Sequence, residues 1–398
     1  MRLVGQFVKD LEMKAGDQVI KVGVAILVAA AGWLASSCAT PLKTGRAEIV
    51  QTVEGFHRPE SVVFSLDGAT MFVGNCASDL FGPDRNRVGM VKGKGAISKC
   101  SVDSKGRVTI IDLKFIDELN SPLGLCVVPK ATSKFPRNTL MVNQGITLLV
   151  DEAGNPITDA AALETGILFF DPESGERLGR IDLGIGSVVA DKIGHSTLLP
   201  NSLAFDGNGN LFITDTAKGG DRQDPPQPAH PGLIRIAFDA IDRVAEGDGD
   251  SLGSNDVTFT PMEGVPNGVG YWAEHDAICV VTMGGTPPEG TAIYQMAASS
   301  FPRADLPVPI RGDVGTADGI AFTPAGTIVT SRFSGDMLAV PKRGEAFPLE
   351  IAKLTAPADH RLLVLPDGSS LLAVPEQARI EPEHWNQRVR MIRLPRGF

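Results

Sequence analysis

One short pattern of apolar and polar residues occurs six times along the chain. Each copy opens with a residue that is polar in five of the six copies, continues with an apolar alternation, and then turns into a second apolar run. A two-residue period on both sides of a tight turn is typical of a β-hairpin. The first strands are predicted at Glu60–Phe64, Leu123–Val127, Asn201–Phe205, Asn267–Tyr271, Asp318–Phe322 and His360–Val364. The second strands are predicted at Met71–Asn75, Leu140–Gln144, Leu211–Asp215, Ala277–Thr282, Thr327–Thr330 and Ser370–Val374.

The spacing of these hairpins predicts a closed ring of blades. Six units share the chain, and about 58 residues per unit suit a four-stranded blade with generous loops. Further strands are predicted between the copies at Val108–Asp112, Gly166–Phe170 and Leu233–Ala237. The C-terminal run Val389–Leu394 can pair with Glu48–Val53 inside one blade, which removes the free sheet edges. The fold class is therefore all-β, a six-bladed β-propeller of four-stranded antiparallel blades, with Ala240–Ala245 as the best helix candidate.

The amino-acid composition agrees with this fold and limits the classes of molecule that the protein is expected to bind. Apolar residues make up 43% of the 398 residues, and the 44 glycines and 28 prolines exceed average usage of roughly 7% and 5%. The net charge is −10, and an acidic chain without a basic stripe is unsuited to nucleic acid. The same charge would help to gather a cation. We expect a monomer that acts on a small-molecule substrate.

The first 38 residues have the features of an export signal. Lys14 and Lys21 precede the apolar run Val22–Leu34, which is shorter than the roughly 20 residues needed to cross a bilayer. Small residues before Cys38 resemble a bacterial lipobox, in which the cysteine is lipidated. A plain secretory signal and an uncleaved anchor remain as alternatives. We expect a signal peptide at 1–38, a linker at 39–46 and the propeller at 47–398, in an exported periplasmic or cell-surface lipoprotein of a bacterium that touches the membrane only through Cys38.

Four cysteines follow Cys38 in the chain. Cys76 and Cys100 bracket one Gly- and Lys-rich loop and are the expected disulfide in an oxidising compartment. Cys126 and Cys279 lie in apolar strand-like runs and are expected to be buried thiols. No C-x-x-C motif is present, so a thiolate zinc site is not indicated.

The first residue of each copy is the strongest functional signal. Equivalent positions of the inner strands project to one level of a propeller tunnel. They are occupied by Glu60, Leu123, Asn201, Asn267, Asp318 and His360. Two carboxylates and two carboxamides in one ring are the hard oxygen ligands that Ca²⁺ prefers. The alternative is that Asn and Asp only satisfy their own backbone at the turn into each strand.

Four motifs resemble the gluconolactonase/regucalcin family, which includes lactonases and diisopropyl fluorophosphatase-like phosphotriesterases. They are RPESVVFSLDGATMFVGN (58–75), PNSLAFDGNGNLFITDT (200–216), PNGVGYW (266–272) and ADGIAFTPAGTIVTSRFSGDMLAV (317–340). The resemblance implies a six-bladed propeller with Glu60, Asn201, Asn267 and Asp318 as Ca²⁺ ligands. It also implies hydrolysis of a lactone or a similar (phospho)ester. The family's substrate-wall residues are not recognisable, and the 144–198 loop is longer than a compact blade needs.

Two residues are the candidate catalytic groups. Asp318, beside the ion, would activate water or attack the substrate directly, and Ca²⁺ would polarise the carbonyl or phosphoryl oxygen. His360 would shuttle protons or hold a second ion, or be a hydrogen-bonded tunnel histidine. His195 is a weaker candidate for the substrate pocket, with loop structure as the alternative.

Other polar residues are expected to have no catalytic role. Asn143 and Asp215 end second strands and are expected to be turn residues. Ser251 matches G-x-S-x-G within a polar loop, whereas a nucleophile elbow needs a strand before the serine and a helix after it.

A non-catalytic alternative stays open, a propeller that binds a ligand or protein partner in the cell envelope around a structural calcium. A hydrolase needs a pocket above the ion. A binding module would show a plugged tunnel or a broad apolar upper face.

Overall fold

The computed structural model describes residues 46–76, 79–81, 87–284, 291–301, 306–377 and 387–398. Residues 45–396 form one compact unit. The predicted signal peptide, Cys38 and all but the last residue of the predicted linker lie outside the described residues. No helix in the described part of the chain is long and apolar enough to cross a membrane.

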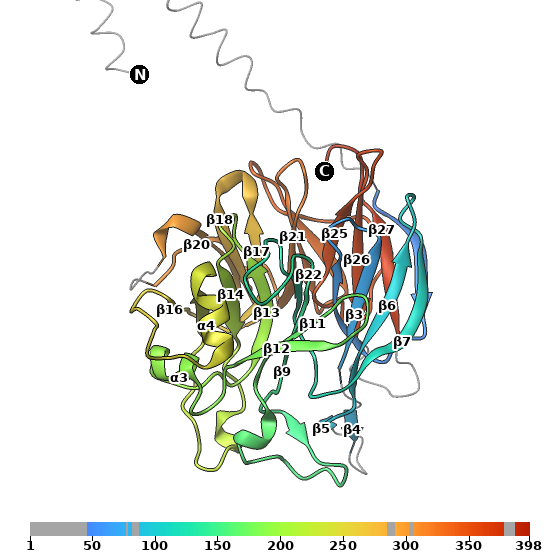
Figure 1. Ribbon diagram of the computed structural model, residues 1–398. Helices are drawn as coiled ribbons and strands as arrows, with labels where there is room; N and C mark the ends of the chain where they lie inside the picture. The colour runs from blue at the N-terminus through green and yellow to red at the C-terminus, as the bar shows by residue number, and fades with distance from the viewer. Residues whose placement is uncertain (1–45, 77–78, 82–86, 285–290, 302–305, 378–386) are drawn as a thin grey trace, which may run out of the picture. The chain divides into compact units, whose positions relative to one another are not determined.

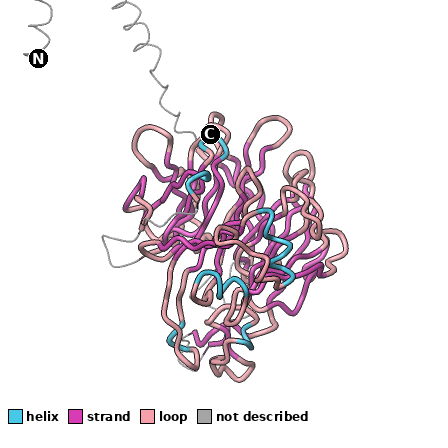
Figure 2. Tube along the Cα trace, turned by 60° about the vertical axis from the view of Figure 1, so that its left-hand side comes forward, coloured by secondary structure: helices cyan, strands magenta, loops and turns pink. Residues whose placement is uncertain are grey.

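Six four-stranded antiparallel sheets build the compact unit, which confirms the predicted six-bladed β-propeller (Figures 1 and 2). The first three blades are β2 (Pro59–Phe64), β3 (Thr70–Asn75), β6 (Gly95–Val102) and β7 (Val108–Leu119); β8 (Leu125–Val127), β9 (Leu140–Gln144), β11 (Gly166–Phe170) and β12 (Arg177–Asp182); and β13 (Pro200–Phe205), β14 (Leu211–Asp215), β15 (Gly232–Ile236) and β16 (Val257–Pro261). The next two are β17 (Pro266–Trp272), β18 (Ala277–Thr282), β19 (Ala292–Ala297) and β20 (Pro309–Gly312); and β21 (Ala317–Phe322), β22 (Ile328–Arg332), β23 (Asp336–Val340) and β24 (Phe347–Pro348).

The sixth blade closes the ring with strands from both ends of the propeller. It consists of β25 (Arg361–Val364), β26 (Ser370–Glu376), β27 (Arg388–Arg393) and β1 (Glu48–Glu54). β1 pairs antiparallel with β27 from Glu48 opposite Arg393 to Glu54 opposite Arg388, as predicted. The buried carboxylate of Glu376 on β26 accepts hydrogen bonds from Arg388 and Arg390 on β27, the strand with which β1 pairs.

Close packing of neighbouring inner strands explains the small residue that follows the first residue of most copies. A Cβ on Gly124 would lie 2.4 Å from the carbonyl oxygen of Asn201 in the next blade. A Cβ on Gly268 would lie 2.3 Å from the carbonyl oxygen of Asp318. Because real Cβ atoms do not approach backbone oxygens so closely, larger residues here would push the blades apart.

Elements beyond the blades lie mostly in the long loops. A three-stranded sheet, which the sequence pattern did not predict, consists of β4 (Asp79–Phe81), β5 (Arg87–Val91) and β10 (Leu149–Val150), and β4 and β5 are at the lower end of the propeller in Figure 1. Within the described residues, the α-helices are α3 (Val188–Ile193) and α4 (Ile241–Glu246), and α4 confirms the predicted helix. Single 3₁₀ turns in the same part of the chain are η1 (Ala161–Leu163), η2 (Gly220–Arg222), η3 (Phe238–Ala240), η4 (Ala273–His275) and η5 (Ala298–Ser300).

The expected disulfide between Cys76 and Cys100 is wrong. Both side chains are buried free thiols. Cys100 pairs with Met71, one pair from one end of the β3–β6 ladder, and Cys76 lies one residue beyond the other end. The five steps along the chain from Met71 to Cys76 span roughly 16 Å of strand, whereas a disulfide joins Cα atoms about 4.4–6.8 Å apart. Cys126 and Cys279 are free thiols as expected, although Cys126 is only partly buried.

Candidate active site

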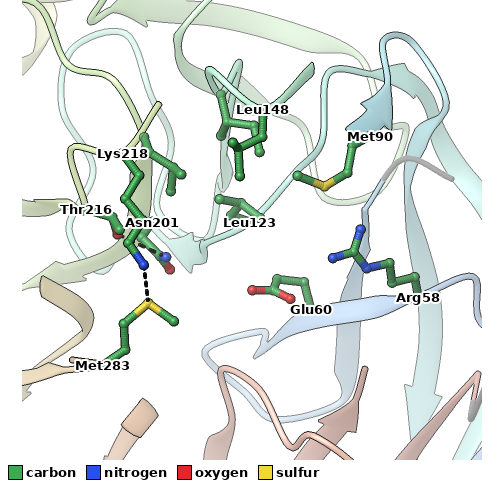
Figure 3. Close-up of a pocket in the computed structure, with 11 residues that line it drawn as sticks. Arg58, Glu60, Met90, Leu123, Leu148, Asn201, Thr216, Lys218 and Met283 are labelled. Atoms are coloured by element: carbon green, nitrogen blue, oxygen red, sulfur yellow. Dashed lines mark hydrogen bonds between the residues drawn. The ribbon is translucent and has the colours of Figure 1, made fainter. Parts of the chain in front are cut away.

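A cavity of about 120 Å³ lies where the inner strands of the first blades begin. Its polar lining consists of Arg58, Glu60, Asn201, Thr216 and Lys218. Its apolar lining consists of Met90, Leu123, Ile146, Leu148, Leu199 and Met283. Figure 3 shows the Glu60 carboxylate directed into the cavity, with Arg58 beside it and Asn201 on the opposite side.

A shared backbone register brings Glu60 and Asn201 to this cavity. Each follows a proline that pairs with the last residue of the next strand, Pro59 with Asn75 and Pro200 with Asp215. The pairing shifts directly after each proline, as a β-bulge does when it re-aims a side chain. Asn201 donates through Nδ2 to Thr216 Oγ1 at 3.2 Å, which leaves its amide oxygen for another partner.

Asn267 and Asp318 occupy the same register in the next two blades. Pro266 pairs with Thr282, and Ala317 pairs with Arg332. Asn267 is buried beside the cavity, because its Nδ2 lies 3.5 Å from Sδ of the cavity residue Met283. Its Oδ1 is buried without a hydrogen-bond partner among the described residues. Asp318 is also buried, and its side chain is not among those that line the cavity.

The sixth blade departs from the predicted ring. Pro357 pairs with Glu376 at the position that the proline or alanine holds in the other blades. The next residue, Ala358, therefore takes the register position that the sequence pattern gave to His360. The first hairpin of this blade has more residues between the Pro357–Glu376 pair and the turn than the hairpins of the other blades have. The sequence pattern placed the first position at a fixed distance before the turn, and in this blade that distance leads to His360 instead of Ala358. The sixth position carries a methyl group and no ligand.

His360 lies deeper, between the fifth and sixth blades. Its Nε2 is 3.1 Å from the carbonyl oxygen of Val329 on β22. Burial, with a further contribution from the charge of Arg361, lowers the pKa of His360 to about 4. The imidazole is therefore neutral near pH 7. These surroundings match the alternative that the sequence left open, a hydrogen-bonded tunnel histidine.

A buried ion pair lies next to His360. Arg361 Nη1 lies 2.6 Å from Asp359 Oδ1, and Ser202 Oγ donates to Asp359 Oδ2 at 3.3 Å. Arg361 Nη2 reaches the carbonyl oxygens of Leu125 and Leu203 at 3.4 and 3.5 Å. One guanidinium thus joins the sixth blade to the second and third. Arg361 also borders a separate cavity of about 390 Å³, between residues 63–68 and 361–364.

Two residues that the sequence suggested were turn residues hold the site together. Asn143 Oδ1 accepts from the backbone N–H of Gly124 at 2.5 Å, and its Nδ2 donates to the carbonyl oxygen of Asn201 at 2.8 Å. Asp215 accepts from the backbone N–H groups of Leu198, Leu199 and Ala217, and burial raises its pKa to about 6. These side chains fix the segments that carry Asn201, Leu199 and Lys218. Their signal in the sequence was a polar residue at or next to the end of an apolar strand.

His195 is not brought to the cavity. Its ring stacks on His230 at a centroid distance of 4.4 Å and meets the edge of Phe259 at 4.5 Å. Burial lowers the pKa of His195. Ser251 lies in the turn after α4, where its Oγ donates to the carbonyl oxygen of Asp248, which agrees with its expected non-catalytic role.

The donor set of the ring fits a hard cation. In the part of the chain that the structure describes, no three His, Cys, Asp or Glu side chains come together as a metal site. A cation at this register would therefore need the amide oxygens of Asn201 and Asn267 as well as the carboxylates. The buried Oδ1 of Asn267, which lacks a hydrogen-bond partner among the described residues, is the observation that favours such an ion, because a lone buried oxygen is costly.

Comparisons with known proteins establish the fold. No family model and no curated protein matches the chain in sequence. In structure the chain is similar to a protein provisionally assigned as a gluconolactonase, with 13% identity, 89% of this chain and 96% of that chain covered, and a TM-score of 0.50. It is also similar to a PQQ-bound aldose sugar dehydrogenase from Streptomyces coelicolor, with 14% identity, 87% of this chain and 97% of that chain covered, and a TM-score of 0.51. A luciferin-regenerating enzyme is similar with 11% identity, 86% of this chain and 94% of that chain covered, and a TM-score of 0.51. Because these similar propellers differ in their described activities, the fold alone does not decide the chemistry.

Proposed function

We propose that the protein is an exported, calcium-dependent hydrolase that acts on a lactone or a similar (phospho)ester in the cavity beside Glu60 and Asn201. The observation that carries the proposal is the common register of Glu60, Asn201, Asn267 and Asp318. Four oxygen donors follow the same backbone position in four blades, and one of these oxygens is buried without a hydrogen-bond partner among the described residues.

Some residues of the site would hold the calcium ion, and others would take part in the reaction or keep the site in place. Glu60, Asn201, Asn267 and Asp318 would hold Ca²⁺, which when bound supplies a Lewis acid for a carbonyl or phosphoryl oxygen. Asp318 would take a proton from the attacking water or attack directly. Asn143 and Asp215 keep the strand starts in place, and the apolar lining would limit the number of water molecules around the bound substrate.

The alternative is a non-catalytic envelope protein with a structural calcium. The side chain of Arg361 favours it, because its guanidinium reaches from the sixth blade to the second and third. Its contacts at Leu125 and Leu203 are two residues farther along the inner strands than Leu123 and Asn201. Arg361 does not line the cavity, which favours the hydrolase.

The experiment compares lactone and phosphotriester hydrolysis by the full chain with Ca²⁺ and with chelator. Asp318→Asn keeps the side-chain shape and removes the charge, and Asp367→Asn on an exposed turn is the matched control. We expect chelation and Asp318→Asn each to lower turnover at least 100-fold, and Asp367→Asn to leave it unchanged. Calcium binding without turnover of any ester would favour the structural-calcium alternative. Turnover that resists chelation would refute the proposal.

A further inference from the structure

The lining of the cavity carries information about the substrate. Six of its eleven residues are aliphatic or thioether side chains, and its charged groups are two cations, Arg58 and Lys218, with one carboxylate, Glu60. The volume of about 120 Å³ is well below the roughly 300 Å³ at which pockets for drug-sized ligands begin. Only a small molecule, or the small end of a larger one, fits inside.

Half of the apolar wall, namely Met90, Ile146 and Leu148, belongs to an insertion that packs in a small hydrophobic cluster. Met90 lies on β5, and the segment with Ile146 and Leu148 leads into β10, which pairs with β5 through Leu149 opposite Met90. Met90, Leu123, Ile146 and Leu199 share one hydrophobic cluster with Leu149, Leu163 and Cys76. We call β4, β5, β10 and residues 145–148 the cap. Because Met90, Ile146 and Leu149 of the cap are packed in this cluster, this part of the wall is held in place.

The cap also positions one of the two cations. Thr147 donates through Oγ1 to the carbonyl oxygen of Lys218, and Gly219 packs against the same threonine so closely that a Cβ would lie 2.5 Å from Oγ1. Lys218 Nζ lies 3.8 Å from Met283 Sδ at the cavity (Figure 3). Arg58 is buried on the other side, next to Glu60, and its backbone φ is +53°. Two cationic heads thus lie on opposite sides of an apolar space.

A sugar lactone is a poor match for this lining. Each buried hydroxyl needs a hydrogen-bond partner, and one without a partner weakens binding. The uncharged polar side chains of the lining are Asn201 and Thr216. The Asn201 amide nitrogen and the Thr216 hydroxyl already bond to each other, and Thr216 Oγ1 also donates to the carbonyl oxygen of Pro266 at 2.7 Å. The Asn201 amide oxygen is the group assigned to the ion.

We propose that the cavity selects a small lactone or ester with an aliphatic or aromatic body and a carboxylate substituent. The cap residues contact the body, and Lys218 binds the carboxylate, on the side of the cavity away from Arg58 and Glu60. This inference rests on the proposed hydrolase function and names the substrate class of the same site. Opening of the lactone by water breaks the acyl C–O bond. It adds hydroxyl to the acyl carbon and a proton to the leaving oxygen, and no other reactant is needed.

The test uses three six-membered lactones with the full chain and Ca²⁺. They are an alkyl-substituted δ-lactone, the same lactone with a carboxylate on its side chain, and δ-gluconolactone. We expect kcat/KM to be at least tenfold higher for the carboxylate-bearing alkyl lactone than for either of the others. Lys218→Met should lower the ratio of carboxylate-bearing to neutral substrate about tenfold. Lys114→Met, on the exposed face of β7, should leave the ratio unchanged.

A binding measurement separates this inference from the hydrolase proposal. The ring-opened alkyl dicarboxylate is titrated into the protein by calorimetry, with the matched polyhydroxy acid as competitor. If no lactone is hydrolysed but the alkyl product binds in a manner that depends on Lys218, the hydrolase proposal fails and the ligand class stands. If δ-gluconolactone is the best substrate, the hydrolase proposal stands and the inferred class is overturned. Equal binding of both acids, or binding insensitive to Lys218→Met, also overturns it.

Discussion

The ion pair between Asp359 and Arg361 gives the sharpest stability prediction, because it joins three blades through one side chain. Asp359 is 3% exposed, and the side chain of Arg361 is 19% exposed. Their closest atoms are 2.6 Å apart, and Arg361 also reaches backbone oxygens of the second and third blades. Removal of either partner leaves a buried charge uncompensated, which costs about 3–5 kcal/mol. Arg361→Met and Asp359→Asn should each lower the free energy of unfolding by that amount.

The two effects should not add. Once one partner is gone, loss of the other removes a group that is already destabilising, so the double variant should lose at least about 2 kcal/mol less than the sum of the single losses. Burial raises the pKa of Asp359, which the charge of Arg361 partly offsets. Without Arg361 the carboxyl group can therefore take up a proton in mild acid, and the loss in Arg361→Met should shrink as the pH falls.

Urea unfolding followed by tryptophan fluorescence measures these free energies. The control is Arg393→Met at an exposed position of β27, which should change stability by less than about 0.5 kcal/mol. Additive losses, or a loss in Arg361→Met no larger than in the control, would refute the view that this pair holds the inner strands together.

Two further predictions concern His360 and the closure of the ring. Burial lowers the pKa of His360 to about 4 in the folded protein, whereas the unfolded chain takes up this proton below about pH 6.5. The contribution of His360 to the free energy of unfolding is therefore complete above pH 6.5. It falls by about 3 kcal/mol when the pH is lowered to 4. The difference in unfolding free energy between the wild type and His360→Gln should therefore decrease over that range, and a constant difference would contradict the burial of a neutral ring. Glu376→Gln removes the carboxylate that holds Arg388 and Arg390 and should lower the unfolding free energy by about 3 kcal/mol. The control is Glu345→Gln, because the side chain of Glu345 is 95% exposed beside Arg311, and it should change the free energy of unfolding by less than about 1 kcal/mol. Similar thermal midpoints for the two variants would contradict the role of Glu376 in closing the ring.

Much of the propeller was predictable because each inner hairpin repeats the same physical requirements. The first residue faces the tunnel, the second must be small where a neighbouring backbone passes, and the following residues alternate between two cores. These requirements act within a few residues of each other, so that they leave a pattern in the sequence. The register of Glu60, Asn201, Asn267 and Asp318 follows from that pattern.

Other features depend on contacts that leave no local pattern. The sixth blade has a longer first hairpin, and its length is visible only when Pro357 is paired with Glu376. The cap forms from residues 79–81, 87–91 and 145–150, segments that are far apart in the chain and too short to show a period. Arg58 and Lys218 carry no motif, and only the folded chain brings them to one cavity. The separation of Cys76 from Cys100 likewise depends on the strand register.

The central claim is that an ion held by the four oxygen donors enables hydrolysis, and a calcium titration tests it most directly. Lactone turnover by the chelator-treated full chain is measured as Ca²⁺ is added back, and calcium binding is measured in parallel by calorimetry. We expect turnover and binding to rise with the same half-saturating concentration. Asn267→Ala, which removes the buried oxygen that has no hydrogen-bond partner among the described residues, should shift both to at least tenfold higher calcium. Turnover that is independent of calcium, or binding that Asn267→Ala leaves unchanged, would contradict a role of this ion in hydrolysis.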